Sequence, residues 1–294
     1  MYVVFVMPFV LYIFIFSYLP MLGIVVAFKD FKYNLGIWGS KWVGFSNFRV
    51  FFGMVGAVRL FRNTLLYNAV FILSGTAVSL IVAFLLFEIK SKRAVKAYQT
   101  MMFIPYYLSW VVVTFIGFVF LSYNVGLINM IAAALGQRRV NYYVTPGPWP
   151  GILIFMNIWK SMAVGTALYY SQLLSIDPEY KEAALLEGAN RWQIVWHIYL
   201  PFLFPILIIM HILAIGGLFN SDFGLFYQFT MNNGALYSVT DVLDTYIYRT
   251  LTSSSSANYS MSTAAGLLKS VIGMILIITT NGIVKKLDRS SSLF

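Results

Sequence analysis

The residues of this chain that could do chemistry are few. Its two histidines, His197 and His211, are too few for a histidine-based metal cluster, and no cysteine is present to supply a thiolate ligand, a nucleophile or a disulfide. A membrane glycosyltransferase or protease would need paired acids or a serine–histidine set at membrane depth. The acids Asp222, Asp241 and Asp244 fall instead in a predicted loop. We therefore expect neither a catalytic site nor a metal site in this chain.

Motifs for nucleotide binding and hydrolysis are missing from the sequence as well. The chain has no GxxxxGK[ST] phosphate loop, and the dipeptide Gly-Lys does not occur anywhere in it. Neither HExxH nor GxSxG is present. We therefore do not expect the chain to bind ATP by the phosphate-loop motif or to be a hydrolase of those two classes.

Composition indicates which solvent surrounds the chain. Of its 294 residues, 60% are hydrophobic and only 10% are charged, whereas a soluble domain carries about 25% charged residues. A soluble protein of this length could not bury so much apolar surface, so lipid must surround much of it. The formal net charge is +10, but the basic residues are scattered among apolar runs and form no stripe that could follow phosphates. Nucleic acid is therefore not an expected partner.

Six apolar runs are each long enough to cross a bilayer, which takes about 20 residues per helix. They cover residues 3–28, 63–87, 98–122, 151–174, 202–220 and 261–284. The first run has no basic leading region and no small-residue cleavage site, so it is not a cleaved signal peptide. Because it begins at Met1 without any polar lead, we expect a polar extension to precede it in the natural protein. The sequence predicts an all-α, polytopic membrane protein with six transmembrane helices.

The charges of the connecting segments predict the orientation of these helices. The segments 88–99 and 175–200 and the C-terminal tail together hold nine basic residues in about 48 positions, whereas the other three segments hold nine in about 102. Basic residues are thus about twice as dense in the first set, which the positive-inside rule assigns to the cytoplasm. Both termini are then expected to be cytoplasmic.

The segments assigned to the outside are expected to contain turns and short helices. The sequence "TPGPWPG" at 145–151 predicts a rigid turn before the fourth span, and "SSSSANYS" at 253–260 predicts a flexible stretch. In 240–251, apolar and basic side chains recur at helical spacing, which predicts a short amphipathic helix at the membrane surface. No segment is long enough for a separate soluble domain, so residues 1–294 are expected to form one membrane domain.

The loop from 175 to 201 differs from its surroundings because it is polar and helix-forming. Asp177 is a good N-cap, and Pro178 suits the first helical position. Gly188 predicts a bend or a chain reversal. A second helix is expected to run through "ANRWQIVWHIYL" and to stop before Pro201, which opens the next span. On spacing alone, this loop could also be an amphipathic connector that lies on the lipid headgroups.

This loop resembles the signature of the permease subunits of ATP-binding-cassette importers. That signature reads Glu-Ala-Ala, three residues, Gly, nine residues, Ile, one residue and Leu-Pro, and this sequence keeps every interval. The matching residues are Glu182, Ala183, Ala184, Gly188, Ile198, Leu200 and Pro201. Glu187 stands where the family usually has aspartate, which preserves the charge.

The resemblance implies what the loop is for. In that family the segment forms a coupling helix, which docks into a groove of the ATPase subunit and transmits its closure to the spans. The residue types suit this role, because the alanines allow close approach, Glu182 offers a charge to a basic partner group, and Gly188 lets the backbone turn. The residues to which the resemblance assigns ATPase coupling are Glu182, Ala183, Ala184, Glu187, Gly188 and Arg191.

Further stretches extend the resemblance over nearly the whole chain. Residues 18–48, "GLIN" at 126–129, "NIWK" at 157–160 and "TNGIVKK" at 280–286 resemble the carbohydrate-uptake branch of these importers. Within that branch they are most similar to the polysaccharide-permease group, which includes the first permease subunit of the bacterial alginate importer. The resemblance implies a pore-forming subunit, without enzymatic activity of its own, in a bacterial cytoplasmic (inner) membrane.

The resemblance also implies the partners of the chain. They are a second homologous permease that pairs with it as a heterodimer, two ATP-binding-cassette ATPase subunits, and an extracytoplasmic solute-binding protein that delivers a saccharide. ATP and Mg would then be bound by the ATPase, and this chain itself would hold no cofactor.

Polar side chains in or beside the spans are candidates for the substrate path. Ionisable groups at membrane depth are costly and usually face a cavity or a partner, and sugars are held by aromatic faces and convergent hydrogen bonds. The candidates are Asn157, Trp159, Lys160, Tyr169, Asn220, Asp222, Tyr227, Gln228 and Lys269. Alternatives stay open, because Trp159 and Tyr169 could equally pack between helices. For His211, a hydrogen bond to a neighbouring helix is favoured over a place on the path.

Charge predicts an anionic saccharide as the substrate. The segments assigned to the outside hold nine basic and four acidic residues, which leaves five excess positive charges. Such a field raises the local concentration of an anionic ligand, and Lys160 and Lys269 could pair with carboxylates. An alginate-like uronic-acid polymer therefore fits better than a neutral one, although anionic lipid or an acidic solute-binding protein would explain the same charges. An importer of a neutral oligosaccharide and a secondary transporter that works without an ATPase also stay open.

Overall fold

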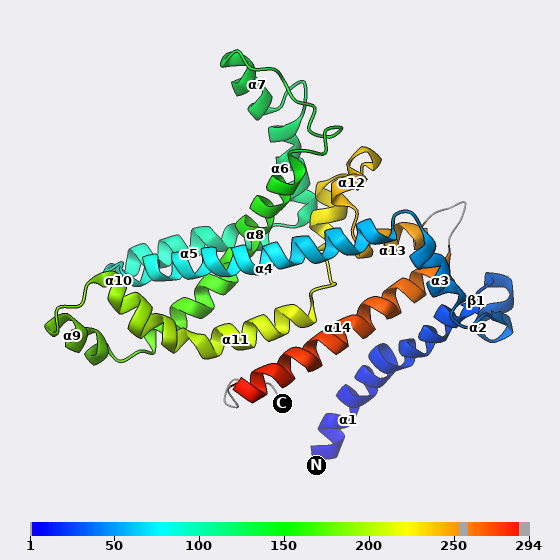
Figure 1. Cartoon of the computed structure of the whole chain (residues 1–294), viewed down its shortest axis with the longest axis horizontal. Helices are drawn as coiled ribbons and strands as arrows, with labels where there is room; N and C mark the ends of the chain where they lie inside the picture. Colours follow the sequence, from blue (N-terminus) through cyan, green and yellow to red (C-terminus); the bar gives the residue numbers. More distant parts are fainter. Residues whose placement is uncertain (1, 253–257, 288–294) are drawn as a thin grey trace. The chain divides into compact units, whose positions relative to one another are not determined.

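The computed structural model describes residues 2–252 and 258–287 and is built almost entirely from helices (Figure 1). Its strands, β1 (Lys29–Asp30) and β2 (Lys41–Trp42), form one small antiparallel pair. The all-α class predicted from the sequence is confirmed. By contacts, the chain divides into two compact units, Met1–Arg62 with Val242–Ile272 and Asn63–Asp241 with Gly273–Phe294. The single permease domain expected over 1–294 stays a prediction.

Helices long and apolar enough to cross a membrane occur at five places in the described chain, and a bent pair of helices adds a sixth. The five are Phe5–Phe28, Ala57–Phe87, Trp149–Leu174, Arg191–Gly216 and Tyr259–Lys286, and the bent pair is Lys92–Tyr107 with Trp110–Leu121. Each predicted span thus has a counterpart, and the prediction of six spans is confirmed when the bent pair is counted as one.

The first unit contains the N-terminal span and the segment that follows it. The span is helical throughout, as α1 (Tyr2–Ile13), the π-helical segment η1 (Phe14–Tyr18) and the 3-10 segment η2 (Leu19–Phe28). The shorter elements after it are η3 (Tyr33–Leu35), α2 (Gly36–Gly39) and α3 (Ser46–Gly53). Asn47 joins the end of η2 to the strand pair, because its side-chain amide donates to the carbonyls of Ala27 and Lys29.

The predicted helix in 240–251 is present in the first unit as α13 (Leu243–Thr252). Its Asp244 forms an ion pair with Lys269, on the first half of α14 (Tyr259–Leu287). Its Tyr246 packs on the buried ring of Phe51 from α3, with the ring centroids 5.7 Å apart. The stretch 253–257, most of the predicted flexible segment, and Arg289 of the basic tail lie outside the described residues.

The second unit contains the remaining spans. They are α4 (Ala57–Phe87) from Asn63 onward, α5 (Lys92–Tyr107) with α6 (Trp110–Leu121), α8 (Trp149–Leu174), α11 (Leu200–Gly216) and the second half of α14. Both α5 and α11 pack against α8. Shorter elements connect them, namely α7 (Leu127–Ala134), η5 (Gly224–Phe229), η6 (Gly234–Leu236) and α12 (Tyr237–Thr240).

The expectation that the second helix of the 175–201 loop stops before Pro201 is wrong. That helix begins as α10 (Arg191–Ile194), continues as the π-helical η4 (Val195–Tyr199) and runs directly into α11. A proline ring clashes with the carbonyl four residues earlier and offers no N–H, and a π-turn with its wider hydrogen-bond ring can absorb this defect. The same arrangement recurs in the first unit, where η1 ends two residues before Pro20.

The expectation of one continuous third span over 98–122 is also wrong. The helix breaks after Tyr107 and resumes at Trp110, and the axes of α5 and α6 differ by 96°. In Figure 1, α6 turns away from the line of α5. Pro105 lies in the last turn of α5, where its ring disfavours continuation, and Ser109 starts α6 by accepting a hydrogen bond from the N–H of Val112 at 3.3 Å.

Beyond α6, the chain forms a compact extension around Asn129 on α7. Its buried side-chain amide donates to the carbonyls of Ser122 and Val140 and accepts from the N–H of Val140. These bonds close the loop between α6 and α8. The predicted turn at 145–151 leads into α8, which begins at Trp149.

Candidate coupling site and transport path

The loop from 175 to 201 begins with the helix α9 (Pro178–Leu186). The Asp177 side chain accepts a hydrogen bond from the N–H of Glu179 at 3.0 Å and caps the first turn. The carboxylates of Asp177 and Glu179 also lie at the helix end where the partial positive charge of its dipole favours them. The N-cap predicted from the sequence is confirmed.

Gly188 ends α9 and reverses the chain. Its φ is +84°, a left-handed conformation that glycine adopts without a steric cost. The N–H of Ala189 donates to the carbonyl of Ala184 at 2.9 Å, and the N–H of Gly188 donates to that of Leu185 at 3.1 Å. This pair of bonds is the Schellman arrangement that satisfies the last carbonyls of a helix. The predicted reversal at Gly188 is confirmed.

The second helix of the loop starts within two residues of the reversal. The N–H of Gln193 donates to Asn190 Oδ1 at 2.9 Å, and the N–H of Asn190 donates to Gln193 Oε1 at 2.7 Å. This capping box satisfies two backbone donors that no helical carbonyl can reach. Because both helix ends at the joint are capped, the angle between α9 and α10 is fixed by local hydrogen bonds.

Buried apolar side chains anchor the loop to the second unit. The cluster that holds it combines residues of α4, α8 and α11 with residues of the loop itself, namely Ala83, Tyr169, Leu173, Ile176, Ile194, Tyr199 and Leu203. Ala184 and Ala189 pack against this cluster. An ion pair of 3.8 Å between Lys181 and Glu88 adds a link to the end of α4, but both groups are about two-fifths exposed, so solvent screens it.

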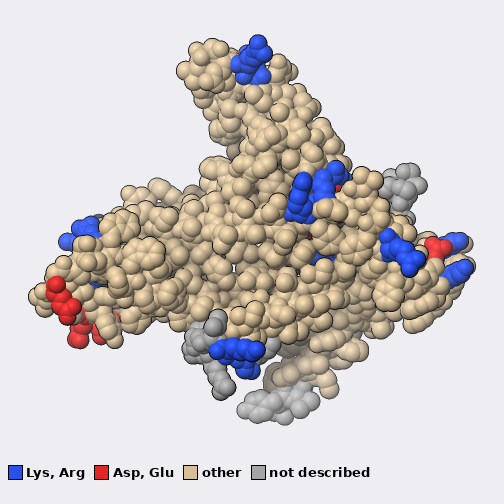
Figure 2. All heavy atoms as spheres, in the orientation of Figure 1, with Lys and Arg blue, Asp and Glu red and all other residues tan. Residues whose placement is uncertain are grey.

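The outward face of the loop is acidic and apolar. Figure 2 shows red acidic atoms at the end of the molecule where Figure 1 places α9. The exposed acids are Asp177, Glu179, Glu182 and Glu187. Leu186 and Trp192 are 90% and 75% exposed beside them. Five of the six predicted coupling residues, Glu182, Ala183, Glu187, Gly188 and Arg191, lie on this exposed side, whereas Ala184 packs inward.

A groove of about 380 Å³ separates α9 from the start of the next helix. Its wall includes Glu187, Gln193 and His197 together with the backbone turn at Gly188. The Nδ1 atom of His197 lies 3.0 Å from the carbonyl of Gln193, so its other ring nitrogen is directed away from that carbonyl. A rigid loop with exposed acids, exposed apolar side chains and a groove has the features of a surface that binds another protein.

Lys160, a path candidate on α8, contacts the break in the third span. Its Nζ donates to the carbonyls of Pro105, Tyr106 and Leu108, at 3.1, 3.0 and 2.5 Å. It also lies 5.4 Å from the centre of the Trp110 ring, within the range of a cation–π interaction. These contacts show what the ammonium does in this structure, and its contact with substrate stays a prediction.

Asp222, a second path candidate, lies on the other side of Trp110. Its Oδ2 accepts from Trp110 Nε1 at 2.9 Å, and its Oδ1 accepts from the N–H groups of Gly224 and Leu225 at 2.9 and 3.2 Å. Asp222 thus caps η5 and ties it to the first residue of α6. A Cβ atom at Gly224 would lie 1.8 Å from Trp110 Cδ1, so only glycine allows this approach.

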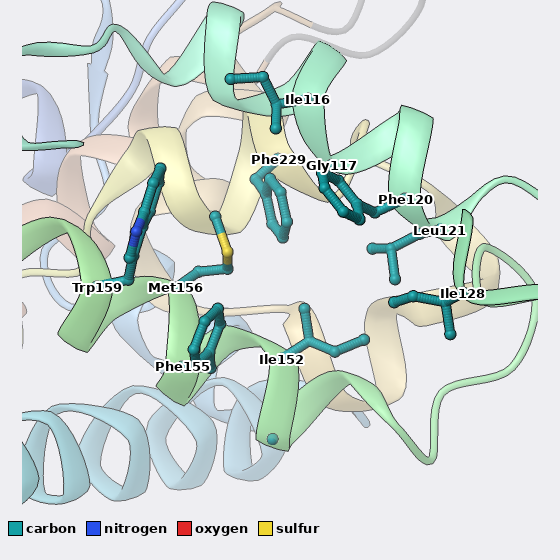
Figure 3. Close-up of a pocket in the computed structure, with 11 residues that line it drawn as sticks. Ile116, Gly117, Phe120, Leu121, Ile128, Ile152, Phe155, Met156, Trp159 and Phe229 are labelled. Carbon is teal, nitrogen blue, oxygen red and sulfur yellow. The ribbon is translucent and has the colours of Figure 1, made fainter. Parts of the chain in front are cut away.

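Trp159 lines two apolar cavities, one on each side of the break. The larger, of about 500 Å³, lies between α6, α8 and Phe229 (Figure 3). The second, of about 380 Å³, is bordered by α4 and α5. In Figure 3, Trp159, Met156 and Ile152 of α8 face Ile116 and other side chains of α6 across the larger cavity. These walls offer few hydrogen-bonding groups to a sugar.

Tyr169 lines a different cavity, of about 320 Å³, between α4, α8 and α11. Its wall carries polar side chains, including Thr76, Ser79, Ser161 and His211. The Nδ1 atom of His211 lies 2.7 Å from the carbonyl oxygen of Leu207, and its Nε2 atom lies 3.4 Å from Thr76 Oγ1. The histidine therefore contacts the neighbouring helix α4, as one of the two alternatives for it anticipated.

The remaining path candidates do not converge on one place. Lys269 lies in the first unit, where its ammonium pairs with Asp244 and both side chains are at most one-fifth exposed. In the second unit, Tyr227 stacks on Phe223 with ring centroids 4.6 Å apart, and Asn220 is exposed at the end of α11. Asn157 and Gln228 are partly buried in α8 and η5. A role for these residues in substrate transfer stays a prediction.

Comparison with known proteins identifies the family. Residues 50–292 match the family described as binding-protein-dependent transport system inner membrane component. This chain belongs to that family. Protein LplB of Bacillus subtilis (strain 168) is 38% identical over 282 residues, which cover 96% of this chain and 87% of that protein.

Two further likenesses concern polysaccharide transport. The polygalacturonan/rhamnogalacturonan transport system permease protein YteP of Bacillus subtilis (strain 168) is 32% identical, over 96% of this permease and 86% of YteP. A chain from the crystal structure of a bacterial ABC transporter involved in the import of the acidic polysaccharide alginate superposes with a TM-score of 0.87 at 28% identity. That match covers 97% of this permease and 95% of the alginate chain. The permease is therefore an inner-membrane sugar-importer subunit, as the sequence resemblance implied.

Several structural features of the permease could not be found by examining ionisable residues alone. The path candidates did not include the polar wall of the Tyr169 cavity, although Gly75, Thr76 and Ser79 place small and polar residues in the middle of α4. They also did not include Trp110. Trp110 follows "YYLS", where nothing in the residue order marks it as the hinge of a bent span.

Proposed function

We propose that this permease is the pore-forming subunit of an importer driven by two separate ATP-binding-cassette ATPases, which it contacts through the loop of α9, Gly188 and α10. The observation that carries this proposal is the construction of that loop. Its helix ends are capped, its inner side is anchored to α4, α8 and α11, and its outer side exposes four carboxylates. A rigid loop anchored to three spans can transmit a displacement to all three.

The chemistry of the loop's outer face specifies the partner surface. Exposed carboxylates at Glu182 and Glu187 favour a basic groove, and Ala183 allows the two backbones to approach closely. Leu186 and Trp192 supply apolar area that a partner would remove from water, at about 25 cal/mol per Å². In this proposal ATP and Mg²⁺ bind the ATPases, and the permease holds no cofactor. A second homologous permease and a solute-binding protein complete the importer.

We further infer that the substrate is an anionic oligo- or polysaccharide. The likeness to the alginate importer chain supports this class, and the name of YteP also concerns polysaccharides. Exposed basic side chains that could attract such a ligand are Lys32, Lys41 and Arg49 in the first unit and Arg138 and Arg139 in the second. A field of this sign raises the arrival rate of an anion and weakens with added salt.

Three other lysines contribute less to this attraction than their number implies. Lys29 is 8% exposed and donates to the carbonyls of Ile37 and Trp38. Lys160 is engaged with the carbonyls at the helix break, and Lys269 with Asp244. The proposal of an anionic substrate therefore relies on the exposed bases and on the relatives, and not on the two lysines at membrane depth.

The experiment that tests the substrate class uses the assembled importer with its solute-binding protein. ATP hydrolysis is measured with a uronate oligomer and with a neutral glucan of equal length, at low and at high salt. We expect the uronate to stimulate hydrolysis more strongly, and the difference to shrink with salt. Equal stimulation by both sugars, or stimulation by the glucan alone, would assign the permease to neutral saccharides and leave its place in an ATP-driven importer intact.

The rival function, secondary transport without an ATPase, has its own test. The permease is reconstituted into vesicles alone and with its partner permease, and saccharide uptake is followed under an ion gradient. We expect no uptake in either preparation, because in this proposal transport requires ATP hydrolysis by the separate ATPases. Uptake driven by the gradient would reject the ATP-driven importer.

A further inference from the structure

The break in the third span leaves backbone carbonyls without helical partners. A helix that ends at Tyr107 leaves its last carbonyls without the N–H groups of a following turn, apart from the N–H of Leu108, which donates to the carbonyl of Pro105 at 3.3 Å. Lipid offers no hydrogen bonds to replace them, so a break at membrane depth is tolerated only where it is buried in protein or lines a water-filled cavity. A donor from a neighbouring helix is one way to satisfy these carbonyls.

Lys160 supplies that donor. An ammonium has three N–H groups and no acceptor, and the three carbonyls that it contacts, of Pro105, Tyr106 and Leu108, use all three. The Trp110 ring lies 5.4 Å from the Nζ and faces its charge. The acidic group that lies beyond this ring is Asp222, which binds the indole N–H. The lysine is thus held by the bent backbone, and it makes the bend possible.

The bend in turn positions α6 as a wall. Gly117 of α6 lies so close to Phe229 that a Cβ atom there would be 2.4 Å from its ring, and Gly224 approaches Trp110 in the same way. The larger apolar cavity lies between this α6 surface and α8 (Figure 3). Any change of the bend would therefore move the cavity wall and break the contacts between α6 and η5.

Lys160 also connects the bend to the coupling loop. It lies on α8, which runs without interruption to Leu174, three residues before the cap of α9. The buried cluster that anchors the loop includes Tyr169 and Leu173 of the same helix. A displacement of the loop that moves α8 along its axis would pull on the three carbonyls at the break.

We propose that Lys160 is a positioning residue for transport, which clamps the bent third span to α8 so that movement of the coupling loop changes the orientation of α6. This inference rests on the proposed function for its link to ATP hydrolysis. The clamp itself is a property of the permease and can be tested without transport. It assigns to Lys160 a role in holding protein backbone, in place of a contact with substrate carboxylates.

The test measures the bend directly. Because the permease has no cysteine, Ala97→Cys on α5 and Val119→Cys on α6 place two spin labels on the arms of the bend with no background, provided that cysteine-free partner subunits are used. Both side chains are exposed. At 1.5 Å per residue, a straight helix would separate the two positions by about 33 Å. A bend of 96° brings them to about 20 Å by the same rise.

In the assembled importer we expect one short-distance population for the wild type and for Lys160→Arg, which keeps a cationic donor. Lys160→Met should add a longer-distance population, and substrate-stimulated ATP hydrolysis should fall about tenfold, the size of effect expected when a charged hydrogen-bond donor is lost. The matched control is Lys96→Met, which removes the same charge from an exposed position on α5. It should leave the distances unchanged.

A Lys160→Met importer with the wild-type distance distribution would overturn the proposal, whatever its ATPase activity. If Lys160→Met does not assemble, Lys160→Gln, which keeps a neutral donor, is judged by the same criterion. Absence of substrate-stimulated hydrolysis in the wild type would count against the proposed function, while the distances would still decide the clamp.

Discussion

The coupling loop and the broken third span are both irregular, but they are stabilised in different ways. The loop is stabilised by its own sequence, because Asp177, Gly188 and the Asn190–Gln193 pair each act within a few residues of chain. The break is stabilised from outside. Its carbonyls bind Lys160, 52 to 55 positions away, and its Trp110 binds Asp222, 112 positions away.

This difference teaches which irregularities are robust on their own. A capped turn needs no partner helix, so the loop can present one shape to a protein that binds and leaves. A break held by a distant lysine depends on how two helices lie against each other, so it can respond when one of them moves. The predictions below separate these two kinds of stabilisation.

The largest effect is expected from Gly188→Val. A β-branched residue at φ +84° is strained by about 1–3 kcal/mol, which corresponds to a loss of about fivefold to 150-fold in the population of the loop shape that docks. The amount of ATPase that co-purifies with the permease should fall by a similar factor. Asparagine tolerates the left-handed conformation, so Gly188→Asn should restore most of the association.

A matched control for Gly188→Val is Gly136→Val. Gly136 ends α7 with φ +72° and open space around its Cα, so the substitution imposes the same strain away from the loop. It should lower stability without releasing the ATPase. Equal loss of ATPase in both variants would mean that strain in general, and not the shape of this loop, governs association.

The next effect is expected from Gly224→Ala, which tests the break. The added methyl group would lie 1.8 Å from Trp110 Cδ1, and overpacking of this kind costs about 1–3 kcal/mol. The melting temperature of the purified permease should fall. Gly75→Ala on α4, where nothing lies within 4 Å, should raise it slightly, because alanine favours a helix over glycine. A fall of equal size in both variants would contradict close packing at the break.

A smaller effect is expected from Asp177→Ala, which removes the cap of α9. Losing an N-cap costs about 1 kcal/mol, so amide hydrogen exchange in the first turn of α9 should speed up about fivefold. Asn caps as well as Asp, so Asp177→Asn should behave as the wild type. Unchanged exchange in Asp177→Ala would show that the anchoring cluster alone holds the helix.

The smallest effect is expected from Lys181→Met. Its ion pair with Glu88 is long, at 3.8 Å, and both groups are about two-fifths exposed, so the pair contributes less than about 0.5 kcal/mol. Stability in denaturant should be nearly unchanged. A loss above about 1 kcal/mol would show that this contact, rather than local capping, fixes the loop on α4.

The sequence was sufficient wherever the physical cause is local. The apolar runs of the spans, the cap at Asp177 and the reversal at Gly188 each follow from residues within one or two turns, and all three are present. The short helix near 243–252 also follows from local periodicity.

Sequence reasoning failed where the cause is a contact between distant segments. Pro105 and Ser109 are the local signals of a break within 98–122, but the donor that holds it, Lys160, lies in another span and cannot be assigned from the run itself. The continuous helix through Pro201 was missed for a related reason, since the π-helical turn that accommodates the proline is not marked by any residue type. The ion pair of Lys269 with Asp244 was missed as well, because the two residues lie on separate helices.

The most direct test of the central claim is a cross-link between the coupling loop and the ATPase. Because the permease lacks cysteine, Ala183→Cys places one photoactivatable label on the exposed side of α9, and Leu135→Cys places the same label at the end of α7. In the purified importer, we expect the label at Ala183→Cys to cross-link to the ATPase, and the label at Leu135→Cys to form no cross-link with it. Capture from Leu135→Cys alone, or from neither position in an importer that hydrolyses ATP, would contradict docking through this loop.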